Sequence, residues 1–159
     1  KAAAPIGASF TLITLATGSL WGKPIWGTWW VWDARLTSVV ILLFLYLGHI
    51  ALTNAFDDPT RGARAAAILA LVGAVNVPII HFSVDWWNTL HQPASVSRLA
   101  APAMDPSMLR PLLVMTLAFM AYFLTLWLIR IRAEIALRKL RVLRIAHAHT
   151  METTMTAGN

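Results

Sequence analysis

The chain has 159 residues, of which 58% are hydrophobic and only 13% are charged, and its mean hydropathy is +0.63. Soluble domains carry about 25% charged residues, so the composition excludes an ordinary soluble domain and predicts an all-α integral membrane protein. No cysteine is present, which excludes disulfides and thiolate chemistry. The net charge of +6 does not indicate nucleic-acid binding, because the basic residues stand at the ends of apolar runs.

Four apolar stretches are each long enough to cross a bilayer, which takes about 20 residues. They cover residues 2–20, 36–56, 65–84 and 109–129. Loops at 21–35 and 85–108 join them on one side, and a polar turn at 57–64 joins them on the other. Asn76 and Pro78 are expected to interrupt the third stretch. We therefore predict a bundle of four transmembrane helices in a single membrane domain at 1–146, followed by a polar tail at 147–159 whose last ten residues are disordered.

The lysines and arginines are unevenly divided between the two sides of these helices. Nine of the thirteen lie on the side that holds Lys1, the 57–64 turn and the tail. Such an excess marks the cytoplasmic side. The pattern predicts a multi-pass membrane protein with a cytoplasmic C-terminus, whose loops at 21–35 and 85–108 face outward, into the periplasm if the cell is a Gram-negative bacterium.

The loop at 21–35 has an unusual concentration of tryptophan, with five in fifteen residues, and Asp33 and Arg35 close it. Glycine and proline argue against a continuous helix through its first half. An aromatic belt that anchors helix ends is the plainer interpretation, but a belt needs fewer rings. We predict an aromatic surface beside a few fixed polar groups. The tryptophans are Trp21, Trp26, Trp29, Trp30 and Trp32; the glycines and proline are Gly22, Gly27 and Pro24.

The second loop adds Trp86, Trp87 and His91. No cysteine, glutamate or closely spaced histidine pair completes a zinc site here. Tryptophan rings with a histidine suit a flat ligand that carries its own metal, such as haem, which a histidine can ligate. The loop position favours His91 as the ligand. His81 lies inside the third stretch, where its ring is expected to hydrogen-bond a backbone carbonyl freed by Pro78.

Three further polar residues have two interpretations each. Asp33 either caps the following helix or acts in the site. Arg35 either lies at the outer membrane interface without a role in binding or pairs with a haem propionate or a partner's carboxylate. His49 lies in the middle of the second stretch, where a functional role is possible, but we favour packing against a neighbouring helix.

Two blocks of sequence resemble haem-handling proteins of cytochrome c biogenesis. Residues 21–37 resemble the WWD signature of these proteins, and residues 76–92 look like the haem exporter protein C (CcmC) family. The resemblance implies a periplasmic WWD segment that holds haem b and presents it to the haem chaperone CcmE. It places the axial ligand of the haem iron at His91. The implied haem-binding set is Trp26, Trp29, Trp30, Trp32, Asp33, Arg35, Trp86, Trp87 and His91.

The chain departs from this family in one respect. The family has six spans, and a first axial histidine precedes the third. This chain has four predicted spans and no such histidine, so we expect its first two helices to be missing and cannot name the first ligand.

The resemblance implies a binding and transfer subunit, not an enzyme. A phosphate-binding Gly-x-x-x-x-Gly-Lys-Ser/Thr loop is absent from the sequence, so ATP-driven release would fall to the ABC-type subunits CcmA and CcmB, with the small subunit CcmD. Membrane lipid is a further expected partner. One alternative is a cytochrome c haem lyase of the related WWD type. A second is a transporter of ions or small solutes with a pore lined by Asn76, Pro78 and His49.

Overall fold

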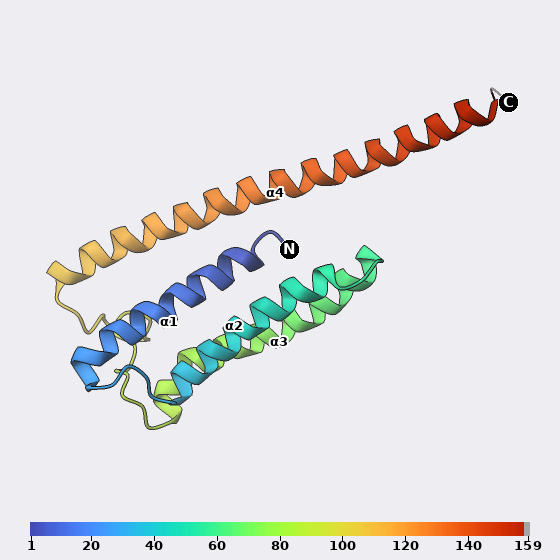
Figure 1. The fold of residues 1–159 in the computed structure, drawn as a ribbon. Coiled ribbons are helices and arrows are strands. Elements are labelled where there is room, and N and C mark those ends of the chain that lie inside the picture. The colour runs from blue at the N-terminus through green and yellow to red at the C-terminus, as the bar shows by residue number, and fades with distance from the viewer. Residues whose placement is uncertain (158–159) are drawn as a thin grey trace.

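The computed structural model describes the backbone of residues 1–157 and the side chains of residues 1–148 and 151. Within residues 1–157 the only regular elements are four α-helices, and each is long and apolar enough to cross a membrane. The predicted all-α membrane fold with four spanning helices is therefore confirmed. The helices are α1 (Ala4–Trp26), α2 (Ala34–Asn54), α3 (Pro59–Trp86) and α4 (Pro106–Ala157) (Figure 1).

Helix α1 extends further than the sequence indicates. It continues through Trp26 with Pro24 inside it and ends at Gly27, whose φ of 76° is left-handed. The Gly27 N–H closes the last turn on the Lys23 carbonyl at 3.0 Å. The prediction that the loop begins at Trp21 is wrong. A proline removes its own N–H from the helix but does not have to end it in a membrane span, and the left-handed glycine three residues later supplies the usual cap.

Two aspartates begin the next helices. The Asp33 carboxylate accepts the Leu36 N–H of α2 at 2.8 Å, and the Asp58 carboxylate accepts the Thr60 N–H of α3, also at 2.8 Å. Side-chain acceptors at this position satisfy backbone donors that the first turn leaves unpaired. The capping role considered for Asp33 is therefore confirmed.

The predicted interruption of α3 is wrong, because the helix runs without a break through Asn76 and Pro78. Asn76 is buried, and its side-chain amide donates to the Ser38 carbonyl of α2 at 2.9 Å. The polar side chain thus serves packing between α2 and α3. This contact assigns Asn76 to a helix interface and not to the pore surface of the transporter alternative.

Small residues bring α2 and α3 together along their length. Ala66 is 1% exposed, and a Cβ atom added at Gly62 would lie 3.1 Å from the Leu52 carbonyl oxygen. Small residues permit this close backbone approach in membrane helices. The His49 Nδ1 atom lies 3.0 Å from the Ala66 carbonyl, so the predicted packing role of His49 is confirmed.

Helix α4 stands apart from the other three (Figure 1). Among the helices of residues 1–157 it contacts only α1, where Phe10 makes T-shaped contacts with the Phe119 and Tyr122 rings. Lys1, which precedes α1, forms an ion pair with Glu134 at 3.9 Å. Helix α4 runs past the predicted span and through most of the predicted disordered tail. That part of the prediction is wrong, because residues 130–157 contain no glycine or proline and many strong helix formers. Gly158 and Asn159 lie outside the described residues.

The four helices alternate in direction, so the loops at 27–33 and 87–105 meet at one end of the molecule (Figure 1). We call this the tryptophan-rich end. It holds the C-terminal ends of α1 and α3 and the N-terminal ends of α2 and α4. Residues from both loops are thereby placed together, as the loop positions in the sequence predict.

Candidate functional site

Asp33 is the centre of the hydrogen bonds at the tryptophan-rich end. Its Oδ1 atom is the cap of α2, and its Oδ2 atom accepts the Thr89 hydroxyl and lies 2.7 Å from the His91 Nδ1 atom. The Asp33 side chain is only 4% exposed and that of His91 18%. A buried carboxylate therefore ties the loop after α3 to the start of α2.

The surroundings of Asp33 favour its ionised form. Burial acts to raise the pKa of this carboxyl group, but the hydrogen bonds from Thr89 and from the Leu36 N–H, together with His91, outweigh burial and hold the pKa below its ordinary value. Donors that point at a carboxylate stabilise its charge. Asp33 is consequently a negative charge at neutral pH.

Thr89 fixes the loop in the same arrangement. Its hydroxyl oxygen accepts the His91 backbone N–H at 3.1 Å and lies 3.1 Å from the His91 Nδ1 atom. The hydroxyl proton is already given to Asp33. Thr89, which the sequence analysis missed, therefore orients both the backbone and the ring of His91. A threonine two residues before a histidine was the available signal, since short hydroxyl side chains commonly bond backbone N–H groups two residues on.

An aromatic ring covers His91 from α1. The Trp26 ring lies edge-on to the imidazole, with ring centroids 4.7 Å apart and planes at 70°, and Trp21 lies edge-on to Trp26 at 5.3 Å. The extension of α1 through Trp26 makes this contact possible. Trp26 is thus the predicted tryptophan that the structure brings directly to the predicted ligand.

The other predicted tryptophans form separate groups at the same end. Trp30 and Trp32 are edge-on at 5.3 Å, and Trp86 stacks on Phe82 at 5.6 Å and meets Trp87 at 6.1 Å. Large areas of Trp29 and Trp32 face outward, with 54% and 73% exposed. These rings do not make one continuous flat surface, but they leave apolar faces exposed around the His91 loop.

Two buried donors have no hydrogen-bond partner among the described residues. They are the Trp30 indole Nε1 and the Arg35 guanidinium Nε. Leaving a buried donor unpaired costs about 1–3 kcal/mol. Trp30 and Arg35 stand on either side of Asp33 in the sequence, so both unpaired donors belong to the segment that leads into α2.

His81 is not part of this arrangement. Its ring lies edge-on to Phe82 at 4.7 Å, and no hydrogen bond to it occurs within the described part of the chain. The prediction that His81 bonds a carbonyl freed by Pro78 is therefore wrong. An edge-on aromatic contact is ordinary packing.

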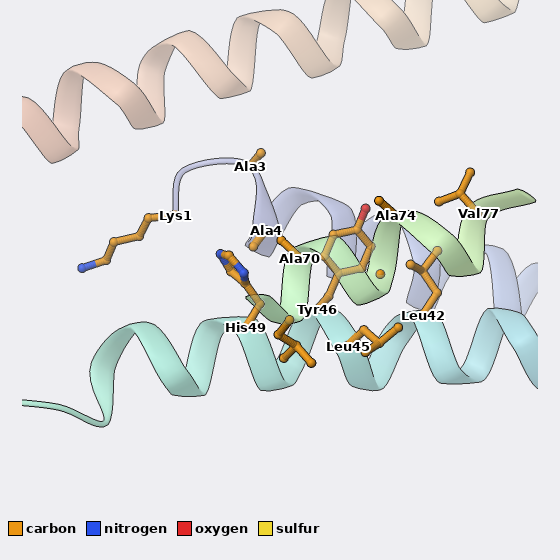
Figure 2. A pocket seen from close by; sticks show the side chains of 12 residues that line it. Lys1, Ala3, Ala4, Leu42, Leu45, Tyr46, His49, Ala70, Ala74 and Val77 are labelled. Atoms are coloured by element: carbon orange, nitrogen blue, oxygen red, sulfur yellow. The ribbon is translucent and has the colours of Figure 1, made fainter. Parts of the chain in front are cut away.

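A cavity of about 360 Å³ lies elsewhere, between α1, α2 and α3. Figure 2 shows the Tyr46 and His49 rings reaching from α2 toward the start of α1. Most of the other lining residues are aliphatic, and the lining part of α2, from Leu42 to His49, is more than two turns beyond the Asp33 cap. The cavity therefore contributes nothing to the tryptophan-rich end.

The arrangement has a limited set of chemical uses. No group of three or more His, Cys, Asp or Glu side chains that could hold a bare metal ion occurs in the residues that the structure describes. A single imidazole, exposed indole faces and an unpaired guanidinium remain. This set suits a large flat ligand that brings its own metal and carries acidic groups.

Comparison with known proteins gives a consistent result. The family model described as Heme exporter protein C matches residues 1–146. A relative named Heme exporter protein C from Bradyrhizobium diazoefficiens is 60% identical over 158 residues, covering 99% of this chain and 60% of that protein. Relatives of the same name from Escherichia coli K12 and Haemophilus influenzae are 56% and 55% identical and cover 88% and 84% of this chain. The chain spans between half and two thirds of the length of these relatives.

Proposed function

The chain belongs to the Heme exporter protein C family, and from that membership we propose that it binds haem b at its tryptophan-rich end and passes it to the haem chaperone CcmE during cytochrome c biogenesis. The observation that carries the proposal is the placement of His91 between the Asp33 carboxylate and the Trp26 ring. That placement leaves one nitrogen of a fixed imidazole for an outside ligand.

The residues at this end fit a haem group in three respects. The His91 Nε2 atom has no partner among the described residues, while Nδ1 is held. The exposed faces of Trp29 and Trp32 can stack on a porphyrin, and the Arg35 guanidinium, whose Nε has no partner among the described residues, can pair with a propionate. Haem iron offers an axial coordination position to an imidazole. His91 would hold the iron, and Trp30, Trp86 and Trp87 would add to the apolar surroundings.

Binding and transfer require no bond-making residue in this chain. The haem would arrive and leave unchanged, and the free energy of release would come from ABC-type partner subunits, CcmA and CcmB, with CcmD. The protein would therefore act as a subunit of a transport and maturation complex and not as an enzyme. The haem lyase alternative differs in that it forms thioether bonds to an apocytochrome.

The function requires the tryptophan-rich end to face the periplasm, with the C-terminus in the cytoplasm of a bacterial inner membrane. The chain has no native cysteine, so Ser97→Cys and Thr60→Cys each create one thiol at an exposed position at opposite ends of the helices. We expect an impermeant maleimide to label position 97 and not position 60 in intact spheroplasts, and to label both after lysis. Labelling of position 60 alone in intact spheroplasts would contradict the orientation.

The function itself is tested with the purified protein in lipid nanodiscs. We expect added haem to give a Soret spectrum of histidine-ligated iron, and haem-free CcmE to take the haem over from the nanodiscs. Empty nanodiscs control for haem dissolved in lipid. A spectrum no different from that of empty nanodiscs would overturn the proposal. Covalent attachment of haem to an added apocytochrome would instead establish the lyase alternative.

A further inference from the structure

We propose that Asp33 is a positioning residue for the iron ligand: it holds His91 in the tautomer protonated at Nδ1 and fixes the ring, so that Nε2 is the nitrogen that meets haem iron. The inference rests on the proposed haem binding for its purpose, but the tautomer and the ring position are properties of the haem-free protein. The contact that carries it is the 2.7 Å approach of His91 Nδ1 to Asp33 Oδ2.

The partners of Nδ1 determine which ring nitrogen carries the proton. One partner is a carboxylate oxygen, which accepts and does not donate when ionised. The other is the Thr89 oxygen, whose only proton is already given to Asp33. Both partners therefore require Nδ1 to be the donor. In a neutral imidazole the other nitrogen, Nε2, then keeps its lone pair, which is the form that a metal binds.

The two carboxylate oxygens of Asp33 have different partners, one in helix α2 and the other in the His91 ring. Oδ1 is held by the first turn of α2 through the Leu36 N–H, and Oδ2 faces the imidazole. Because the cap is part of a helix that packs along α3, the acceptor for His91 is built on a rigid element. A loop histidine anchored in this way has a defined ring orientation before any ligand arrives.

A carboxylate behind a ligating imidazole also changes the ligand itself. An acceptor on the far nitrogen fixes the tautomer and makes the ligating nitrogen more basic, and loss of such a partner commonly weakens metal binding 10- to 100-fold. A capping role alone predicts none of this, because asparagine and serine cap helices about as well as aspartate. The two roles of Asp33 can therefore be separated by substitution.

The test uses Asp33→Asn and Asp33→Ser, both of which can keep the cap. Asparagine replaces the charged acceptor with a neutral amide, and serine is too short to reach the ring. We expect nitrogen-15 NMR of the haem-free protein in nanodiscs to show His91 protonated at Nδ1 in the wild type and to show a mixture of tautomers in both variants. The His91 signals are assigned by their loss in His91→Gln. Haem affinity is expected to fall about 10- to 100-fold, with a higher reduction potential for the haem that still binds.

Asp58→Asn is the matched control, because it makes the same substitution at the cap of α3, where no histidine among the described residues hydrogen-bonds the carboxylate. We expect wild-type tautomer, haem affinity and potential in this variant. Unchanged His91 tautomer and haem affinity in both Asp33 variants would overturn the inference even if the wild type binds haem. A wild type that binds no haem, yet shows the Nδ1-protonated His91 that Asp33→Asn loses, would instead overturn the proposed function and leave the positioning role established.

Discussion

Replacing His91 with alanine should remove the histidine-ligated haem spectrum and stop transfer to CcmE, while the protein still inserts into the membrane. The side chain provides a nitrogen whose ring is already held by Asp33 and covered by Trp26. Loss of the ligand itself is expected to weaken haem binding by more than the roughly 10- to 100-fold that follows loss of an outer partner. Absorption spectra in the Soret and α-band regions measure the change, and added imidazole should restore part of the spectrum by refilling the position on the iron.

His81→Ala is the matched control for this experiment. It makes the same change near the end of α3, where the ring packs edge-on against Phe82. The wild-type spectrum and wild-type transfer are expected, with a small loss of stability. The opposite pattern, in which His81→Ala loses the spectrum and His91→Ala keeps it, would show that the ligand has been assigned to the wrong histidine.

Removing two exposed tryptophans together, Trp29→Ala with Trp32→Ala, should lower haem affinity strongly without unfolding the protein. The rings are 54% and 73% exposed, so their removal forfeits little packing in the haem-free state. Truncating an aromatic residue at the centre of a binding surface commonly costs about 2 kcal/mol or more, which is about 30-fold in affinity for each ring that stacks on the porphyrin. Haem titration in nanodiscs measures the loss, and thermal unfolding checks the fold.

Trp127→Ala serves as the control for the tryptophan pair. Trp127 stacks on Phe123 within α4 and lies outside the two loops. We expect its loss to leave haem affinity unchanged. Equal haem affinity in the wild type and in the Trp29/Trp32 double variant would contradict stacking on haem and would indicate that these loop tryptophans only anchor helix ends at the membrane interface.

The number and type of the helices could be predicted because the signal is compositional. A span needs a run of apolar residues matched to the bilayer, and each of the four runs is visible without knowledge of its neighbours. The ends of the helices were less predictable. Pro24 and Pro78 look like breaks in a sequence, but both lie inside helices in the structure. Membrane helices tolerate a proline where neighbouring groups satisfy the carbonyl that it leaves free, and those neighbours are not local in sequence.

The candidate site likewise has some features that can be predicted from local sequence and others that depend on packing. His91, Asp33 and Trp26 could each be selected as unusual residues in loops on one side of the membrane. Their mutual contact could not, because Asp33 and His91 are 58 positions apart and come together only when α2 packs against α3, where Asn76 donates to the Ser38 carbonyl. In the sequence, capping and a role in the site are therefore alternatives for Asp33. The structure shows the cap on one carboxylate oxygen and the histidine on the other.

The isolation of α4 has a mechanical consequence. Arg110 and Arg130 are 20 positions apart with no charged residue between them, a rise of roughly 30 Å that equals the hydrocarbon thickness of a typical bilayer. Sliding α4 along its axis by one turn, about 5.4 Å, would draw one arginine toward the hydrocarbon, where a central charge costs about 2.5–3.5 kcal/mol. Arg110 and Arg130 thus fix the position of α4 along the bilayer normal. In the membrane plane, α1 is the only helix within residues 1–157 that contacts α4 and restrains its lateral position.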